Sequence, residues 1–214
     1  MIHDKVGAGI RAGPRTFDSN IVRMKEKFEA YVQETIKISR EDSRFMSSLA
    51  SSKRIKKRQL LLKEGEVCYH KMFVVNGLIK VYQIGDRGAE HILRFVQENE
   101  FLTDIDSFRH QTPSKFNIEA LESVEVLTWT RDQFSKVVKA VPAFKLWSEQ
   151  LLLKNFSAGH DRLLQHISAT PADMYQDFVA RFPDVARRVP LHMIASYLGV
   201  SRETLTRIRH AQLR

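Results

Sequence analysis

The residues with the clearest capacity for chemistry lie near the C-terminal end, in the segment SRETLTRIR at residues 201–209. An arginine offers two fixed N–H donors that fit O6 and N7 of guanine, and a carboxylate accepts a hydrogen bond from N4 of cytosine. On a helix, Arg202, Glu203 and Arg207 would all project from the first two turns and could enter the major groove of DNA together. The segment therefore predicts a helix that contacts base edges in DNA.

The preceding residues predict the element that positions this helix. Pro190 is expected in the first turn of an earlier helix, and Gly199 suits the left-handed residue that ends it. Ser201 is expected to cap the second helix, with Leu205 and Ile208 facing inward. The apolar face of the earlier helix consists of Leu191, Ile194, Ala195 and Leu198. This arrangement is a helix-turn-helix, and its outward residues, predicted to bind DNA, are Ser201, Arg202, Glu203, Thr204, Thr206, Arg207 and Arg209.

SRETLTRIR resembles the recognition helix of the Crp/Fnr family of bacterial transcription regulators, whose pattern is S-R-E-T-[VL]-x-R. In that family both arginines and the glutamate contact base pairs, so the resemblance implies these roles for Arg202, Glu203 and Arg207. It extends upstream over most of the chain, but not over the first twenty or so residues. Many members have two wing strands after the recognition helix. This sequence stops at Arg214, so we expect a domain without the wing, with Arg207, Arg209 and Arg214 replacing some of its phosphate contacts.

Composition and charge restrict the class of protein. The chain has 214 residues, with 34 Lys and Arg against 25 Asp and Glu, a formal net charge of +9. Such an excess suits an anionic partner, either nucleic acid or a membrane surface. The single cysteine, Cys68, excludes an internal disulfide framework and fits a reducing cytoplasm. No stretch approaches eighteen apolar residues, so we expect a cytoplasmic protein without membrane contact.

The middle of the sequence has the pattern of a small antiparallel β domain. Turn signals occur at residues 63–66, at Asn76-Gly77, where we expect a hairpin, and at residues 85–88. The basic run KRIKKR at residues 53–58 is expected to be a solvated surface. Short strands are predicted at residues 58–62, 72–75, 78–84, 90–96, 116–120 and 125–130. Regular short strands of this kind predict a β-roll or jelly roll.

The stretch LKEGEVCYHKMFVVNGLIKVYQI resembles the cyclic-nucleotide-binding β-roll of the Crp/Fnr family. In cAMP-binding members a later cassette, G-E-[LI]…R-[ST]-A, holds the phosphate and ribose. Here Thr103 stands at the glycine, Asp104 at the glutamate and Ser114 at the arginine, and Lys115 follows. Without that arginine we do not expect cAMP, although Lys115 or Arg109 can supply part of the charge. The candidate effector pocket is Thr103, Asp104, Ser114 and Lys115, for another small ligand or for none.

Neither a cofactor nor a metal is predicted. An iron–sulfur cluster needs about four cysteines, and the histidines lack metal-ligand spacing. Asp104, Asp106 and His110 would be the candidate groups of an enzyme, but no nucleophile–base pair supports one. We therefore expect no catalytic activity.

Helices are expected on both sides of the β domain. An N-terminal pair is predicted at residues 20–38 and 41–50, the second capped by Ser39, and a short helix at residues 131–138. A long helix at residues 142–167 carries a broad apolar stripe interrupted by Gly159. In the Crp/Fnr family this helix is the dimer seam. The resemblance assigns that role to Trp147, Leu151, Leu152, Phe156 and Leu163.

The sequence thus predicts an α+β fold in four parts. These are a flexible arm (1–19), a β-roll sensor-like domain (20–141), a dimerisation helix (142–168) and a helix-turn-helix domain (169–214). The boundary before the last domain is the helix stop and restart at Ser168-Ala169-Thr170-Pro171. The predicted function is a transcription regulator that binds a palindromic operator as a homodimer and contacts RNA polymerase if it activates. The alternative is a ligand-binding module whose helix-turn-helix binds protein.

Overall fold

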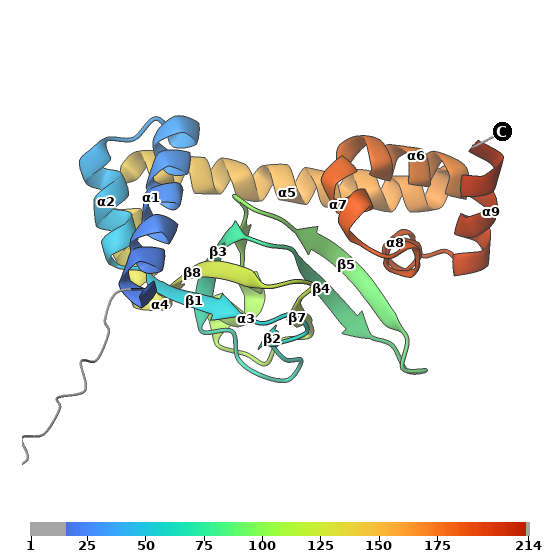
Figure 1. The fold of residues 1–214 in the computed structure, drawn as a ribbon, viewed down its shortest axis with the longest axis horizontal. Coiled ribbons are helices and arrows are strands. Elements are labelled where there is room, and N and C mark those ends of the chain that lie inside the picture. Colours follow the sequence, from blue (N-terminus) through green and yellow to red (C-terminus); the bar gives the residue numbers. More distant parts are fainter. Residues whose placement is uncertain (1–15, 213–214) are drawn as a thin grey trace, which may run out of the picture.

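The computed structural model describes the backbone of residues 16–212 and the side chains of residues 19–211. Its centre is a pair of four-stranded antiparallel sheets, ordered β1-β8-β3-β6 and β2-β7-β4-β5. Helices flank the sheets at two opposite ends, and one long helix connects the ends (Figure 1). The strands are β1 (Ser51–Ile55), β2 (Leu60–Leu62), β3 (His70–Asn76), β4 (Ile79–Ile84), β5 (Glu90–Val96), β6 (Phe101–Leu102), β7 (Asn117–Ala120) and β8 (Val124–Thr130).

The α+β class with an antiparallel roll is as predicted, but two strands were missed. β1 lies largely within the basic run, which was expected to be a solvated surface. Ile55 of this run faces the core between the sheets, while Lys53 and Arg54 are exposed. β6 has two residues, too few to show alternation.

The Asn76-Gly77 turn does not close a hairpin, contrary to the prediction. β3 pairs with β6 and β8, whereas β4 pairs with β5 and β7, so this turn carries the chain from one sheet to the other. Gly77 has φ of 101°, and a Cβ atom there would lie 2.8 Å from the carbonyl oxygen of Ser123. The glycine is needed for a corner between sheets, which has the same local signal as a hairpin.

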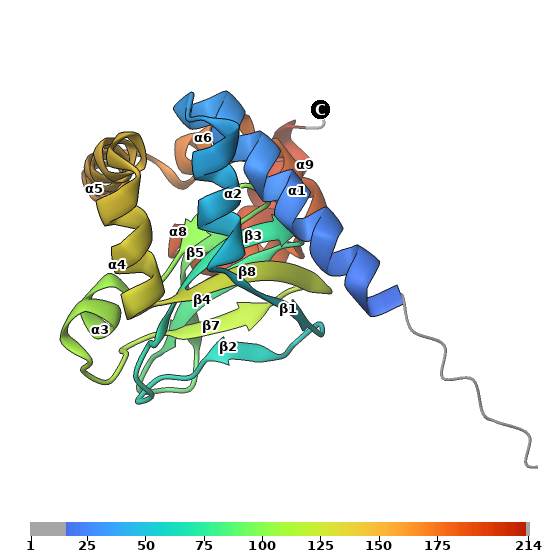
Figure 2. The same ribbon diagram turned by 90° about the vertical axis from the view of Figure 1, so that its left-hand side faces the viewer.

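The outer face of the β1-β8-β3-β6 sheet is covered by the helices α1 (Thr16–Ile36), α2 (Arg40–Ser48) and α4 (Arg131–Ala140), and by the start of α5 (Pro142–Ser168). Figure 2 shows α1 and α2 side by side over this face. The aromatic core beneath them is Phe28, Phe73, Phe101, Trp129 and Phe144. α1 begins before the predicted residue 20, so the predicted arm ends earlier, and its first fifteen residues lie outside the described part.

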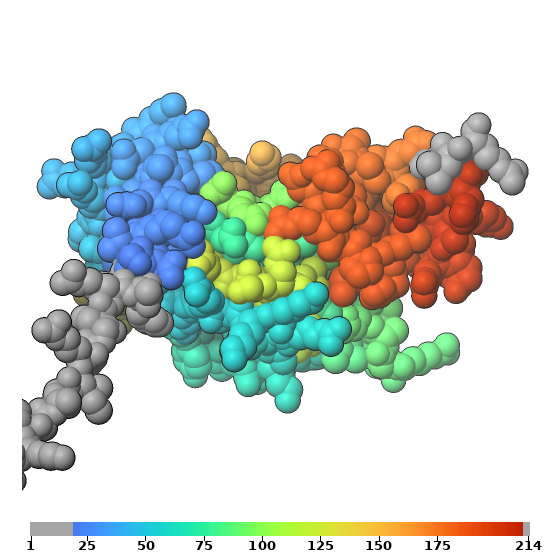
Figure 3. Space-filling view, in the orientation of Figure 1, coloured from blue at the N-terminus to red at the C-terminus, as the bar shows by residue number. Residues whose placement is uncertain are grey.

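The C-terminal helices pack on the outer face of the other sheet at β4 and β5. They are α6 (Pro171–Arg181), α7 (Pro183–Arg188), α8 (Leu191–Leu198) and α9 (Arg202–Gln212). One continuous core joins them to Leu78, Tyr82, Ile92 and Phe95 of β4 and β5 and the turn before them. Figure 3 shows the N-terminal helices (blue) and C-terminal helices (orange to red) at opposite ends of the molecule. The helix-turn-helix therefore packs on the β-roll of its own chain.

The helix α5 has two unequal halves. Near its start Phe144 is 1% exposed, and Trp147 stacks on it and contacts Phe101. Further along, Leu153, Phe156 and Ile167 are 65–76% exposed. Within the described residues, no helix is both long and apolar enough to cross a bilayer.

Candidate nucleic-acid interface

Local backbone geometry sets the angle between α8 and α9. Gly199 is left-handed (φ 67°, ψ 27°) and ends α8, as predicted, and the N–H of Val200 returns to the carbonyl of Ala195 at 3.0 Å. Pro190 was expected inside the first turn of α8. Instead it precedes the helix with an extended ψ of 149°, and its carbonyl accepts from the N–H of Met193 at 2.9 Å. Proline still fits, because this position needs no backbone donor.

The first turn and the inner face of α9 fix which side chains are free. The Oγ of Ser201 accepts a hydrogen bond from the backbone N–H of Thr204 at 3.1 Å, as expected for a cap. Leu205 is 0% exposed, and Ile208 packs on the same core. The inner face is thus held by the protein, and the opposite face is presented to solvent.

That outward face carries unpaired charge. Arg202, Arg207 and Arg209 are exposed and form no ion pair within the described part of the chain. Glu203 is also exposed, and hydrogen bonds from its own backbone N–H and from Ser201 lower its pKa, so it is an acceptor at neutral pH. One shallow surface hollow is lined by Arg202, Glu203, Thr206, Arg207 and His210. His210 was not predicted, although it lies one turn after Thr206.

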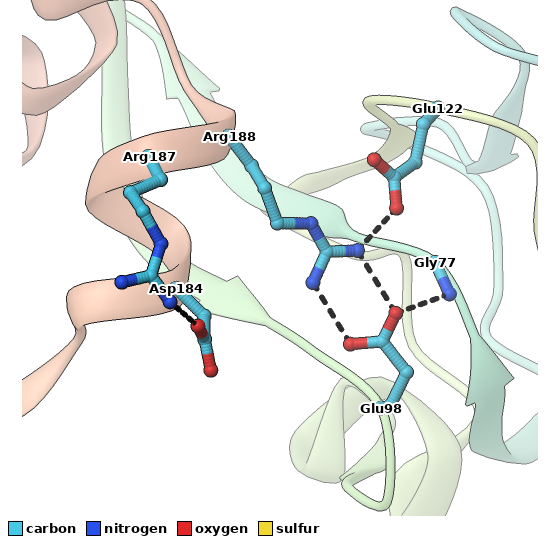
Figure 4. A network of polar contacts seen from close by, with 6 residues as sticks. All are labelled: Gly77, Glu98, Glu122, Asp184, Arg187 and Arg188. Atoms are coloured by element: carbon cyan, nitrogen blue, oxygen red, sulfur yellow. Dashed lines mark hydrogen bonds and ion pairs between the residues drawn. The ribbon is translucent and has the colours of Figure 1, made fainter.

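A second arginine cluster holds the C-terminal helices against the β-roll. Arg188 of α7 forms two hydrogen bonds with the carboxylate of Glu98, each 2.9 Å, and contacts Glu122 as well (Figure 4). The same carboxylate accepts from the N–H of Gly77 at 2.8 Å. Burial raises the pKa of Glu98, but the bonds from Arg188 and Gly77 lower it more, so the net pKa is below its usual range. No pattern in the sequence indicated this cluster, since its members are far apart in the chain.

The docking of α8 and α5 on β5 involves backbone atoms of that strand. The Oγ of Ser196 accepts from the N–H of Ile92 at 3.1 Å and donates to the carbonyl of Glu90. The guanidinium of Arg162 donates to carbonyls of Leu93 and Tyr197 and lies 3.9 Å from the Tyr197 ring centroid. The edge strand β5 is therefore bonded to the C-terminal domain.

The predicted effector pocket is partly closed by its own residues. Asp104 caps the helix α3 (Ile105–His110) through the N–H of Ser107 at 3.2 Å. Its other oxygen accepts from the hydroxyl of Ser114 at 2.7 Å, and both residues are buried. The two residues that the resemblance aligns with the ribose- and phosphate-binding positions thus bond to each other here. The helix α3 itself was not predicted.

The other two predicted pocket residues diverge. Thr103 donates to the carbonyl of His70 at 3.1 Å and faces the space beneath α5, whereas Lys115 is exposed. The four residues therefore do not surround one cavity. Among the cavities of the described residues, a larger one of about 600 Å³ opens elsewhere, between the edge strands β1 and β2. The described residues bring no three His, Cys, Asp or Glu side chains together as a metal site.

The predicted dimer residues divide along α5. Trp147 and Leu151 lie against the β-roll of the same chain. Leu152, Phe156 and Leu163 are 49–65% exposed. Leu153, Leu164 and Ile167 were not assigned to the seam, yet they are 63–76% exposed on the same helix.

Comparison with known proteins agrees with this architecture. Residues 52–140 match the family model of the cyclic nucleotide-binding domain. The chain has the fold of the Crp/Fnr regulators. Similar solved structures include the c-di-GMP-responsive global regulator CLP of Xanthomonas campestris, with a TM-score of 0.69 and 13% identity over 82% of this chain and 92% of that one.

Two further Crp/Fnr-type structures are similar over most of their length. FixK2 of Bradyrhizobium japonicum has a TM-score of 0.63 and 20% identity over 76% of this chain and 85% of that one. A transcriptional regulator of the Crp/Fnr family from Eubacterium rectale has a TM-score of 0.66 and 16% identity, over 86% and 88%. No curated protein sequence matches the chain.

Proposed function

We propose that the chain is a sequence-specific DNA-binding transcription regulator. The observation that carries this is the recognition face of α9, which the fold fixes on its inner side and leaves unpaired on its outer side. A rigid helix with free arginines and an ionised glutamate has the donors and the acceptor that base edges require. The net charge of +9 adds attraction to the phosphate backbone.

The contacts are assigned by position on α9. Arg202, Glu203 and Arg207 are the base-reading residues. Ser201, Thr204, Thr206 and Arg209 lie beside them, and we assign these four to the phosphates at the edge of the groove. Because phosphate contacts position the protein and base contacts specify the sequence, substitutions in the two groups should have different consequences.

The regulator acts as a homodimer joined along α5. Leu153, Phe156, Leu163 and Ile167 follow one another at intervals of 3, 7 and 4 residues, which is the spacing of a coiled-coil seam. All four are 59–76% exposed in the single chain, a contiguous apolar face that a second copy would bury. Two-fold symmetry would then present two recognition helices about 34 Å apart, on the half-sites of a palindrome.

The helices after residue 168 form the DNA-binding part, and the β-roll forms the sensor, whose effector is a small molecule other than cAMP. A regulator of this kind works in the cytoplasm and contacts RNA polymerase when it activates. The alternative, a β-roll signalling module whose helix-turn-helix binds protein, predicts no salt-dependent affinity for DNA.

The test is selection of binding sites from a random duplex library at two salt concentrations. We expect a palindromic motif, with affinity that falls steeply with salt because counterions are released from the phosphates. A selection repeated with candidate small anions covers a protein that needs an effector. No enrichment under either condition would contradict the proposal and favour the alternative.

A further inference from the structure

Two lysines of the β-roll, Lys80 buried and Lys71 partly buried, have opposite surroundings. Lys80 on β4 is 3% exposed, contacts the carboxylate of Glu90 and lies 3.4 Å from that of Glu119. Lys71 on β3 is mostly buried, yet among the described residues its ammonium has no hydrogen-bond or ion-pair partner. Its ammonium lies 5.6 Å from the ring centroid of Phe134. Lys71 is therefore a cation without a counter-ion.

Such a charge is unfavourable unless something compensates it, because an ammonium loses hydration on burial. Burial first, and then the charge of Arg94, lowers the pKa of Lys71 from its ordinary 10.5 to about 8, while the thiol of Cys68 acts in the opposite direction. The residues of α4 and α5 that face it carry no charge. An anion beside Lys71 would restore its charge.

The space for such an anion exists. Lys71 and Arg94 line a cavity of about 60 Å³ between the β-roll and α5, enough for several waters or one small anion. Arg94 gives one N–H group to Glu100 at 2.5 Å. The hydroxyls of Thr103 and Ser148 already donate to backbone carbonyls. The walls are mainly aromatic and aliphatic: Phe101, Phe134, Phe144, Trp147, Leu151 and Leu152.

We propose that this cavity binds a small oxyanion, of carboxylate or sulfate type, with the ammonium of Lys71 as its counter-ion. The guanidinium edge that Glu100 leaves unused and the amide of Asn155 on α5 supply further donors. The site differs from the predicted pocket, of which it shares only Thr103. Its regulatory role rests on the proposed function: the anion would join the β-roll to the helix proposed as the dimer seam.

The test is calorimetric titration of the full chain, without DNA, with sodium sulfate and with sodium acetate, each against sodium chloride at equal ionic strength. We expect one saturable site per chain for at least one of these anions. The variant Lys71→Met should weaken this affinity about tenfold or more, because the charged partner is lost. Lys136→Met, an exposed lysine on α4, is the matched control and should leave it unchanged.

Proton uptake gives a second readout. At pH 8 about half of the Lys71 side chains are charged, so anion binding should take up at most about half a proton per chain. At pH 6 nearly all are already charged, and binding should take up almost none. Titrations in two buffers of different ionisation enthalpy measure this uptake. Both anions stay ionised over this range. Without ligand, Lys71→Met should also unfold at a higher temperature than the native chain. If Lys71→Met does not fold, Lys71→Gln replaces it in both measurements. Equal heats for all three salts, or unchanged binding in both variants, would overturn the proposal whatever the DNA experiments show.

Discussion

The helices α5 to α9 have two arginine-rich surfaces that differ in what the arginines contact. On the side that docks on the β-roll, Arg162 and Arg188 are bonded to carbonyls and carboxylates of the same chain. On α9, Arg202 and Arg207 are exposed and have no ion pair among the described residues. Charge alone therefore does not distinguish a structural arginine from a ligand-binding one. The two kinds of arginine are distinguished by the number of N–H donors that the protein itself leaves unused.

The largest effect should come from a change that touches neither arginine set. Phe156→Glu places a charge in the apolar face of α5 and should leave the chain monomeric. The single chain should still fold, because Phe156 is 65% exposed. Loss of simultaneous binding to two half-sites should weaken operator binding at least about a hundredfold. Analytical ultracentrifugation and anisotropy measure the two effects. A dimer that persists would contradict the α5 seam. Lys145→Glu, exposed near the start of the same helix, is the control.

On the docked surface, Arg188→Gln should lower the free energy of unfolding by roughly 1–2 kcal/mol, a value discounted for the partial exposure of Arg188, Glu98 and Glu122. Arg187→Gln is the matched control. Arg187 is the neighbour of Arg188, and among the described residues its one ion pair is with the exposed Asp184, so its loss should change stability little. Denaturant unfolding compares them. Equal losses in the two variants would show that the bonds from Arg188 to Glu98 and Glu122 stabilise the fold no more than an exposed ion pair does.

The same cluster predicts a dependence on pH. The pKa of Glu98 is lowered in the folded chain, so its contribution to stability is present above the ordinary value of 4.5 and is lost as pH falls below it. The native chain should therefore lose more stability than Arg188→Gln between about pH 5 and pH 3. Parallel acid unfolding curves would contradict this.

A smaller effect is expected at Gly159. A Cβ atom there meets no atom within 4 Å in the single chain, so Gly159→Ala should stabilise α5 by about 1 kcal/mol. If the partner helix approaches closely at this point, the same change should weaken the dimer instead. Thermal unfolding measured at several protein concentrations separates the two.

Short-range signals in the sequence predicted the local geometry well. Ser201, Gly199 and the apolar spacing of α8 fixed the helix-turn-helix, because caps and amphipathic faces depend on neighbouring residues. The hairpin predicted at Asn76-Gly77 was wrong, because the same local signal occurs in a hairpin and in a corner between two sheets. The Arg188 cluster and the unpaired Lys71 were out of reach, because each depends on which distant residues the fold brings near. The Asp104–Ser114 bond likewise depends on the fold, which brings together the two ends of the segment around α3.

The most direct test of the account is the base preference of Arg207→Ala on the selected operator and on its single-base-pair variants, with Arg188→Gln beside it. We predict that Arg207→Ala loses about 1–3 kcal/mol of binding free energy and relaxes the choice at one base pair in each half-site, while Arg188→Gln keeps the native preference. Two results would contradict the assignment of α9 as the helix that reads DNA. One is an Arg207→Ala protein that loses the same affinity on the operator and on all of its variants, and the other is one that retains every base preference.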